Sequence, residues 1–77
     1  MITDDQIYDI IKEVSPGIDT AKIDIAVDLK QYGLDSIDMF NVILMLQDAL
    51  GREIPDRDIH LLRTISSIKS YVNPAHE

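Results

Sequence analysis

The feature that most constrains this chain is a single stretch of alternating residues, 23–29, that has no second such stretch to pair with. From Ile23 to Leu29 every second residue is apolar, which is the period of a half-buried strand. A lone strand would leave its backbone N–H and C=O groups without ladder partners. We therefore expect a long loop that directs some apolar side chains into the core of an otherwise helical chain.

A first helix is predicted close to the N-terminus. Thr3 and Gln6 have the spacing of a capping box, in which each side chain satisfies a backbone donor at a helix start. Apolar residues then recur at the spacing of one helix face, namely Ile7, Ile10, Ile11 and Val14. The Ser-Pro-Gly sequence at residues 15–17 ends this helix.

A second, longer helix is predicted over residues 36–50. Asp35 can act as its N-cap, and Asp38 three residues later complements the positive end of the helix dipole. Gly51 provides the C-terminal stop. Gly33 places a turn just before the cap.

Two further helices complete the predicted fold. Pro55 favours an extended approach, and Asp56 is expected to cap a short helix over residues 57–61. Thr64 caps a last helix, which the Asn-Pro sequence at 73–74 stops, and its apolar face holds Ile65, Ile68, Tyr71 and Val72. The fold class is therefore all-α: a small four-helix bundle with a long loop between the first and second helices and a short third helix.

Length and composition limit the possible functions. A chain of 77 residues is expected to form one domain, residues 1–77, and the absence of cysteine excludes disulfides and thiolate metal sites. The longest mostly apolar stretch, residues 39–46, is too short to span a bilayer. We expect a cytoplasmic monomer that does not insert into membranes.

The net charge of −7 also restricts the choice of partners. It would repel the phosphates of nucleic acids and anionic lipid head groups, so neither is an expected partner. A charged partner should be basic. The alternative is that the acidity only keeps a small domain in solution.

The second predicted helix has two apolar groups. One, which we expect in the core, holds Met39, Ile43, Leu46 and Leu50; the other holds Ile37, Phe40 and Leu44 and borders polar Asn41 and Asp48. Large apolar side chains beside a polar stripe are a candidate surface for partners. The alternative is a central helix that is buried on most sides.

Ser36 is the residue that packing explains least, and three roles are open to it. Serine is common at helix starts, so a structural role is the simplest. A catalytic nucleophile is poorly supported, because His60 and His76 are distant in sequence and no glycines flank the serine. The third role is a hydroxyl that another enzyme modifies, since the amino end of a helix favours an attached phosphate.

At this point the sequence resembles the acyl carrier protein family. The sequence GLDSID at residues 33–38 is similar to the family's phosphopantetheine attachment motif, and EIPD at residues 53–56 is similar to its approach to the short third helix. The similarity extends to Leu29, Tyr32 and the Thr-Ile-Ser sequence at residues 64–66, and it covers nearly the whole chain.

The resemblance implies a carrier and not an enzyme. A phosphopantetheinyl transferase would attach 4'-phosphopantetheine from coenzyme A to Ser36, making the chain a phosphoprotein. The thiol of this arm would hold acyl groups as thioesters for fatty acid, lipid or polyketide-type biosynthesis. The chain itself would then have no catalytic residues.

The resemblance also implies partner enzymes that load and transfer acyl groups. Compared with the family, the second helix has a thinner acidic row and a bulky Phe40, so the docking patches of these enzymes should be basic or mixed basic and apolar. The residues predicted to contact partners are Asp35, Ile37, Asp38, Phe40, Asn41, Leu44 and Asp48. An aminoacyl or peptidyl carrier is one alternative, and a helical interaction module without a prosthetic group is another.

No metal site is expected. Asp56, Asp58 and His60 alternate, but in a short helix these positions do not converge on one point. The acidic residues near the start of the second helix, Asp24, Asp28, Asp35 and Asp38, are taken as surface acidity rather than as ligands of a divalent ion.

Overall fold

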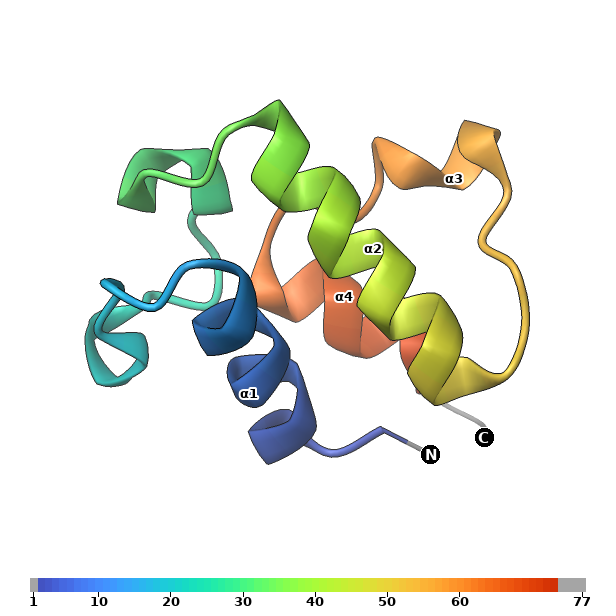
Figure 1. The fold of residues 1–77 in the computed structure, drawn as a ribbon, viewed down its shortest axis with the longest axis horizontal. Coiled ribbons are helices and arrows are strands. Elements are labelled where there is room, and N and C mark those ends of the chain that lie inside the picture. The colour runs from blue at the N-terminus through green and yellow to red at the C-terminus, as the bar shows by residue number, and fades with distance from the viewer. Residues whose placement is uncertain (1, 74–77) are drawn as a thin grey trace.

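The computed structural model describes residues 2–73, and all of its regular elements are helical. The α-helices are α1 (Asp4–Val14), α2 (Ser36–Leu50), α3 (Asp56–Ile59) and α4 (Ile65–Val72), and two short 3₁₀ helices, η1 (Thr20–Lys22) and η2 (Leu29–Tyr32), lie between α1 and α2 (Figure 1). The predicted all-α class and the order of four helices are confirmed. Pro74 and His76, which the sequence analysis considered, lie outside the described residues.

Side chains fix the start of two helices. The Thr3 hydroxyl accepts a hydrogen bond from the Gln6 amide, and the Gln6 side chain accepts one from the Thr3 amide, which is the predicted capping box of α1. Thr64 and Ser67 form the same reciprocal pair at the start of α4. These bonds satisfy N–H groups that have no partner within the helix.

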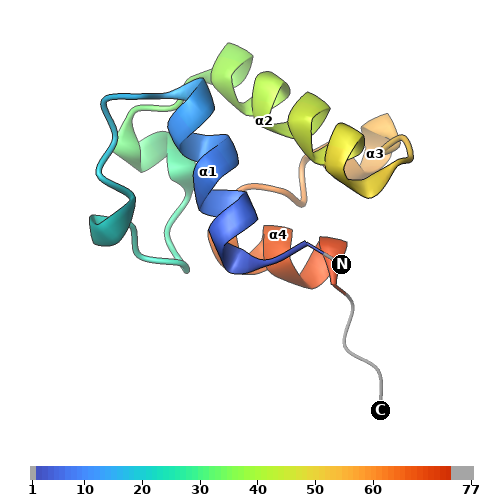
Figure 2. The same cartoon turned by 60° about the horizontal axis from the view of Figure 1, so that its bottom comes forward.

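The core lies between α1, α2 and α4, and α1 packs against both of the other helices (Figure 2). Helix α1 contributes the face predicted from its periodicity, with Ile11 fully buried, and α2 contributes Leu46, which is also fully buried. Further buried side chains come from every helix except α3 and η1 and from the segments outside the helices: Ile2, Ile7, Ile10, Ile23, Leu29, Leu34, Met39, Val42, Ile43, Ile54, Leu62, Ile65, Ile68 and Val72.

The segment between α1 and α2 contains the loop predicted from the lone alternating stretch, and it directs some apolar side chains into the core. Ile23 and Leu29 are buried, whereas Ile25 is 43% exposed. Instead of a strand partner, the loop backbone bonds to the segment before α4 and to its first turn: Leu29 N donates to Arg63 O at 2.8 Å, and Ser66 N donates to Ile25 O at 2.9 Å. These bonds satisfy backbone groups that a sheet would otherwise have to pair. The two 3₁₀ helices were not predicted.

The third helix differs from the prediction. It covers Asp56–Ile59 rather than residues 57–61, and its N-cap is Pro55, with no side-chain cap from Asp56. The reason is that the chain continues in tight turns: Leu61 N donates to Asp58 O and Leu62 N donates to Ile59 O, each at 3.0 Å. Such three-residue spacing ends an α-helix early.

The two ends of the described chain are joined. Ile2 N donates to Asn73 Oδ1 at 3.1 Å, and Asn73 Nδ2 donates back to Ile2 O. Asn73 is also the C-cap of α4. The residue at which the helix was predicted to stop therefore also forms the hydrogen bonds to Ile2.

Candidate functional site

The turn before α2 brings Ser36 to the surface. Gly33 has φ 99°, a left-handed conformation that favours glycine, and it ends η2. Leu34, which follows, is 1% exposed and anchors the turn in the core. Ser36 is then the first residue of α2, and its side chain is exposed.

The two aspartates that flank Ser36 hold the helix start. Asp38 N donates to Asp35 Oδ1 at 2.8 Å, and Asp35 N donates to Asp38 Oδ2 at 3.2 Å. Asp35 is therefore the N-cap, as predicted, and Asp38 completes a capping box that the sequence analysis treated only as a charge on the dipole. Within residues 2–73 the Ser36 hydroxyl makes no hydrogen bond, so this side chain is not needed for the cap.

A cavity of about 280 Å³ borders Ser36. Its walls are largely apolar, and basic side chains stand among them; the lining consists of Asp28, Lys30, Ser36, Met39, Phe40, Ile43, Ile59, His60, Leu62 and Arg63. The fold thus brings His60 to the same cavity as Ser36, which sequence distance did not suggest. No hydrogen bond joins the two side chains in the described part of the chain, so no base is paired with the serine.

A second cavity, of about 430 Å³, continues along α2 and has a different electrostatic character. It shares Phe40, Ile43 and Ile59 with the cavity beside Ser36, so these three side chains form the boundary between the two. Its charged lining residues are Glu53 and Asp56, and the described residues contribute no lysine, arginine or histidine to it.

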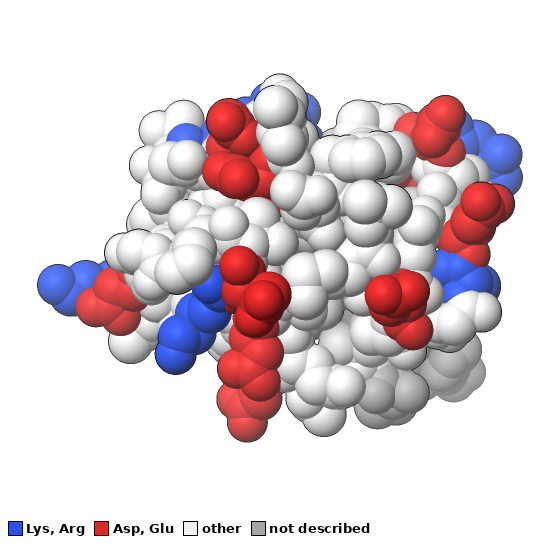
Figure 3. Space-filling view, viewed as in Figure 1, with Lys and Arg blue, Asp and Glu red and all other residues white. Residues whose placement is uncertain are grey.

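The two apolar groups of α2 separate as predicted. Ile37, Phe40 and Leu44 are exposed, at 71%, 54% and 43%, whereas Met39, Ile43 and Leu46 are buried. Val42, which was not predicted in either group, is buried, and Leu50, which was predicted in the core, is only partly buried. Figure 3 shows mostly uncharged side chains over the middle of α2.

The polar residues predicted to contact partners lie along the same helix. Asn41 and Asp48 are exposed and Asp38 is partly buried. Asp48 also borders a shallow cavity towards α1, together with Gln6 and Asp9. Asp48 also follows the exposed Leu44 by four residues, so the two side chains are neighbours on the surface of α2.

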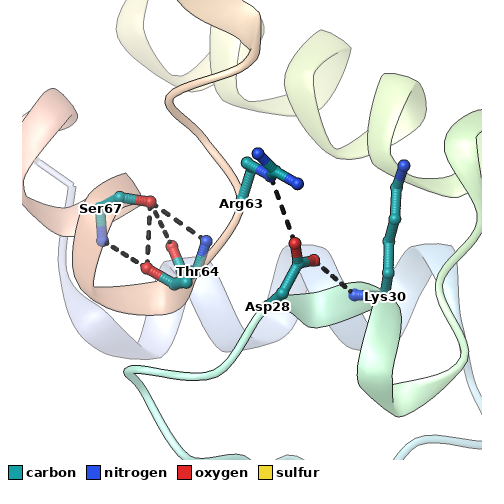
Figure 4. A network of polar contacts seen from close by, with 5 residues as sticks. All are labelled: Asp28, Lys30, Arg63, Thr64 and Ser67. Atoms are coloured by element: carbon teal, nitrogen blue, oxygen red, sulfur yellow. Dashed lines mark hydrogen bonds and ion pairs between the residues drawn. The ribbon is translucent and has the colours of Figure 1, made fainter.

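A polar network ties the loop before α2 to the segment before α4 (Figure 4). Asp28 lies at its centre: Arg63 Nε donates to Asp28 Oδ2 at 3.2 Å, and the backbone N–H of Lys30 donates to Asp28 Oδ1 at 2.9 Å. Because the same segments line the cavity beside Ser36, the network sets the position of one rim of that cavity.

Residues 2–73 lack two features that would point to other classes of function. No group of three or more histidine or acidic side chains is arranged to hold a metal ion. None of the described helices has the length and apolar character needed to cross a bilayer. Neither finding assigns a function by itself.

The site can receive a phosphodiester-linked arm. An exposed hydroxyl without a hydrogen bond stands at a helix N-terminus, where unpaired N–H groups and the dipole favour an anion. An apolar cavity and basic side chains lie beside it. Among residues 2–73 the arrangement offers an exposed hydroxyl beside an apolar cavity with basic side chains, but no hydrogen-bonded pair of nucleophile and base.

Comparison with known proteins agrees with this geometry. Residues 5–72 match the family described as "Phosphopantetheine attachment site", and the chain belongs to this family of phosphopantetheine-binding carriers. A curated acyl carrier protein of Campylobacter hominis is 29% identical over 63 residues, which cover 82% of this chain and 78% of that protein. The chain is therefore an acyl carrier that bears covalent 4'-phosphopantetheine and is not an enzyme.

Proposed function

We propose that Ser36 is the attachment point of the 4'-phosphopantetheine arm. The observation that carries the proposal is the exposed Ser36 hydroxyl, which forms no hydrogen bond within residues 2–73 although both neighbouring aspartates are engaged in the cap. A serine that is not part of the cap can be modified without loss of the helix start. The family match spans this position.

The attachment reaction belongs to a phosphopantetheinyl transferase. The Ser36 oxygen forms a new bond to phosphorus, the diphosphate bond of coenzyme A breaks, and the adenine nucleotide leaves while the hydroxyl proton is taken up by a base. The bound arm supplies a thiol that holds acyl groups, which this cysteine-free chain lacks. The chain's own contribution is the anion-favouring start of α2.

We further propose that partner enzymes dock on the exposed stripe of α2. Three large apolar side chains of this stripe, Ile37, Phe40 and Leu44, lie on the helix that begins at Ser36. Aromatic side chains such as Phe40 are enriched in interfaces, and a few side chains usually carry most of the binding energy. Asp35, Asp38, Asn41 and Asp48 add polar contacts for enzymes with basic or mixed basic and apolar patches, in a cytoplasmic fatty acid, lipid or polyketide-type pathway.

Mass spectrometry tests the attachment site directly. The wild-type protein, incubated with coenzyme A, magnesium and a broad-specificity transferase, should gain one phosphopantetheinyl group, and Ser36→Ala should gain none. Ser66→Ala is the matched control, because Ser66 is also an exposed serine in the first turn of a helix, and it should be modified like the wild type. A mass gain in Ser36→Ala would place the arm elsewhere.

A further inference from the structure

Basic side chains gather on one side of Ser36 in a chain that is otherwise acidic. The chain has 14 acidic and 7 basic residues, not counting histidine. The cavity beside Ser36 is nevertheless lined by Lys30, His60 and Arg63 against a single acidic residue, Asp28. The neighbouring cavity beyond Phe40 shows the opposite sign, with only acidic charges in its described lining. The two cavities therefore attract opposite charges.

Asp28 organises this basic rim without neutralising all of it. Its carboxylate pairs with Arg63 Nε and accepts the backbone N–H of Lys30. Its bonding to Lys30 involves only the backbone, and within residues 2–73 the Lys30 ammonium forms no ion pair. Figure 4 shows the Lys30 side chain extended towards α2 and away from Asp28. The loop thus presents a cation beside the helix that begins at Ser36.

We propose that Lys30 and Arg63 hold the phosphodiester of the arm and so direct the arm over the cavity beside Ser36. The inference rests on the proposed attachment at Ser36, because a phosphodiester bonded to that oxygen must lie within a few ångströms of it. Lys30 and Arg63 line the cavity and outnumber its one acidic side chain, Asp28, whereas Asp35 and Asp38 are not part of its lining. Attraction to Lys30 and Arg63, together with repulsion from Asp35 and Asp38, favours a position of the phosphate at the mouth of the cavity.

Lys30 is the sharper of the two positions to test. Arg63 also has a structural partner in Asp28, so its removal affects the protein with or without the arm. The Lys30 side chain is exposed, and the bond to Asp28 comes from its backbone, so Lys30→Gln keeps every described contact of the loop. Lys22→Gln is the matched control, since it removes the same charge from an exposed lysine that does not line this cavity.

The experiment compares each protein with and without the arm, after mass spectrometry has verified loading at Ser36. Melting temperatures are recorded at about 0.01 M and about 0.5 M salt, where the screening length falls from roughly 30 Å to a few ångströms. The ³¹P resonance of each loaded protein is recorded under the same conditions. Arg63→Gln serves as a second variant, evaluated only by the difference between its loaded and unloaded forms.

At low salt, the change in melting temperature on loading should be less favourable in Lys30→Gln and Arg63→Gln than in the wild type, and their ³¹P resonances should shift. Lys22→Gln should match the wild type, and high salt should remove the differences. Equal loading effects and equal ³¹P resonances in all four proteins would overturn the inference while leaving the attachment intact. Failure of the wild type to gain mass would overturn both.

Discussion

The Tyr71 hydroxyl donates a 2.6 Å hydrogen bond to Asp58 Oδ2 and thereby joins α4 to α3. Helix α3 has only four residues and no side-chain cap, so it has little intrinsic stability. Its Ile59 forms part of the boundary between the two cavities along α2. The bond from Tyr71 therefore helps to hold a wall of the candidate site in place.

This bond predicts a specific dependence of stability on pH. The hydrogen bond to Asp58, with a smaller contribution from burial, raises the pKa of Tyr71 above its ordinary value of 10.0. The folded protein then keeps a proton that the unfolded chain releases, so the stabilisation is complete below pH 10.0 and is lost as the pH rises through the raised pKa.

Tyr71→Phe should consequently cost about 1 kcal/mol at neutral pH, the usual net contribution of a hydrogen bond. Above pH 10.0 the difference from the wild type should shrink. Urea unfolding of both proteins across this range provides the measurement. Because the other tyrosines are common to both proteins, their titration cancels, and a constant difference at all pH values would contradict the prediction.

Leu46 and Phe40 should respond differently to truncation. Leu46 is fully buried, so Leu46→Ala should destabilise the fold by roughly 2–5 kcal/mol. Phe40 is 54% exposed, and Phe40→Ala should cost much less stability yet slow acyl loading or transfer by a cognate enzyme. Thermal melts combined with transfer rates distinguish the two effects. A Phe40→Ala protein that melts like Leu46→Ala would remove the proposed docking surface.

The salt dependence of the transfer rates measures how much charge contributes to docking. Asn41 and Gln47 interrupt the acidic side chains of α2, so docking should depend more on apolar contact than on charge. We expect transfer rates to fall less with added salt than those of a carrier with a densely acidic second helix. Rates measured for both carriers with the same enzyme provide the comparison, and an equally steep fall would point to charge-driven docking.

Replacement of Asp28 and replacement of Arg63 should lower stability by different amounts, although the two residues form one ion pair. The Arg63 side chain is 64% exposed, so Arg63→Ala should cost less than about 1 kcal/mol. Asp28 also caps η2 through the Lys30 amide, and loss of a cap typically costs about 1 kcal/mol more. Asp28→Ala should therefore be the more destabilising change in urea unfolding. Equal losses would mean that the cap contributes nothing.

Gly33→Ala should lower the stability of the protein, whereas Gly17→Ala should not. A Cβ meets nothing within 4 Å at either position, so the difference comes from the backbone alone. At φ 99° an alanine is strained by about 1–2 kcal/mol, and the strain falls just before Ser36. Gly17→Ala is the matched control and should be neutral or slightly stabilising, because alanine reduces the freedom of the unfolded chain. Melting temperatures and loading rates check both.

The sequence alone determined the three longer helices and their starts, since these depend on residues close together in the chain. Asp35 and Thr64 were identifiable as caps because a cap bonds to an amide three residues away. The exposed and buried groups of α2 followed from helical periodicity, as the exposure of Phe40 and the burial of Leu46 demonstrate. The short α3 was misplaced by one residue at its start and two at its end, because its bounds depend on turn bonds that no local pattern marks.

Only the tertiary structure decided what surrounds Ser36. Lys30, His60 and Arg63 come from segments up to 33 residues apart, and no periodicity relates them. They meet because backbone bonds such as Leu29 N to Arg63 O fasten the first long loop to the segment before α4. A contact of this kind depends on loop paths and on the packing of distant helices, which the sequence encodes only through the whole fold. The serine was visible in the sequence, but its cavity and basic rim were not.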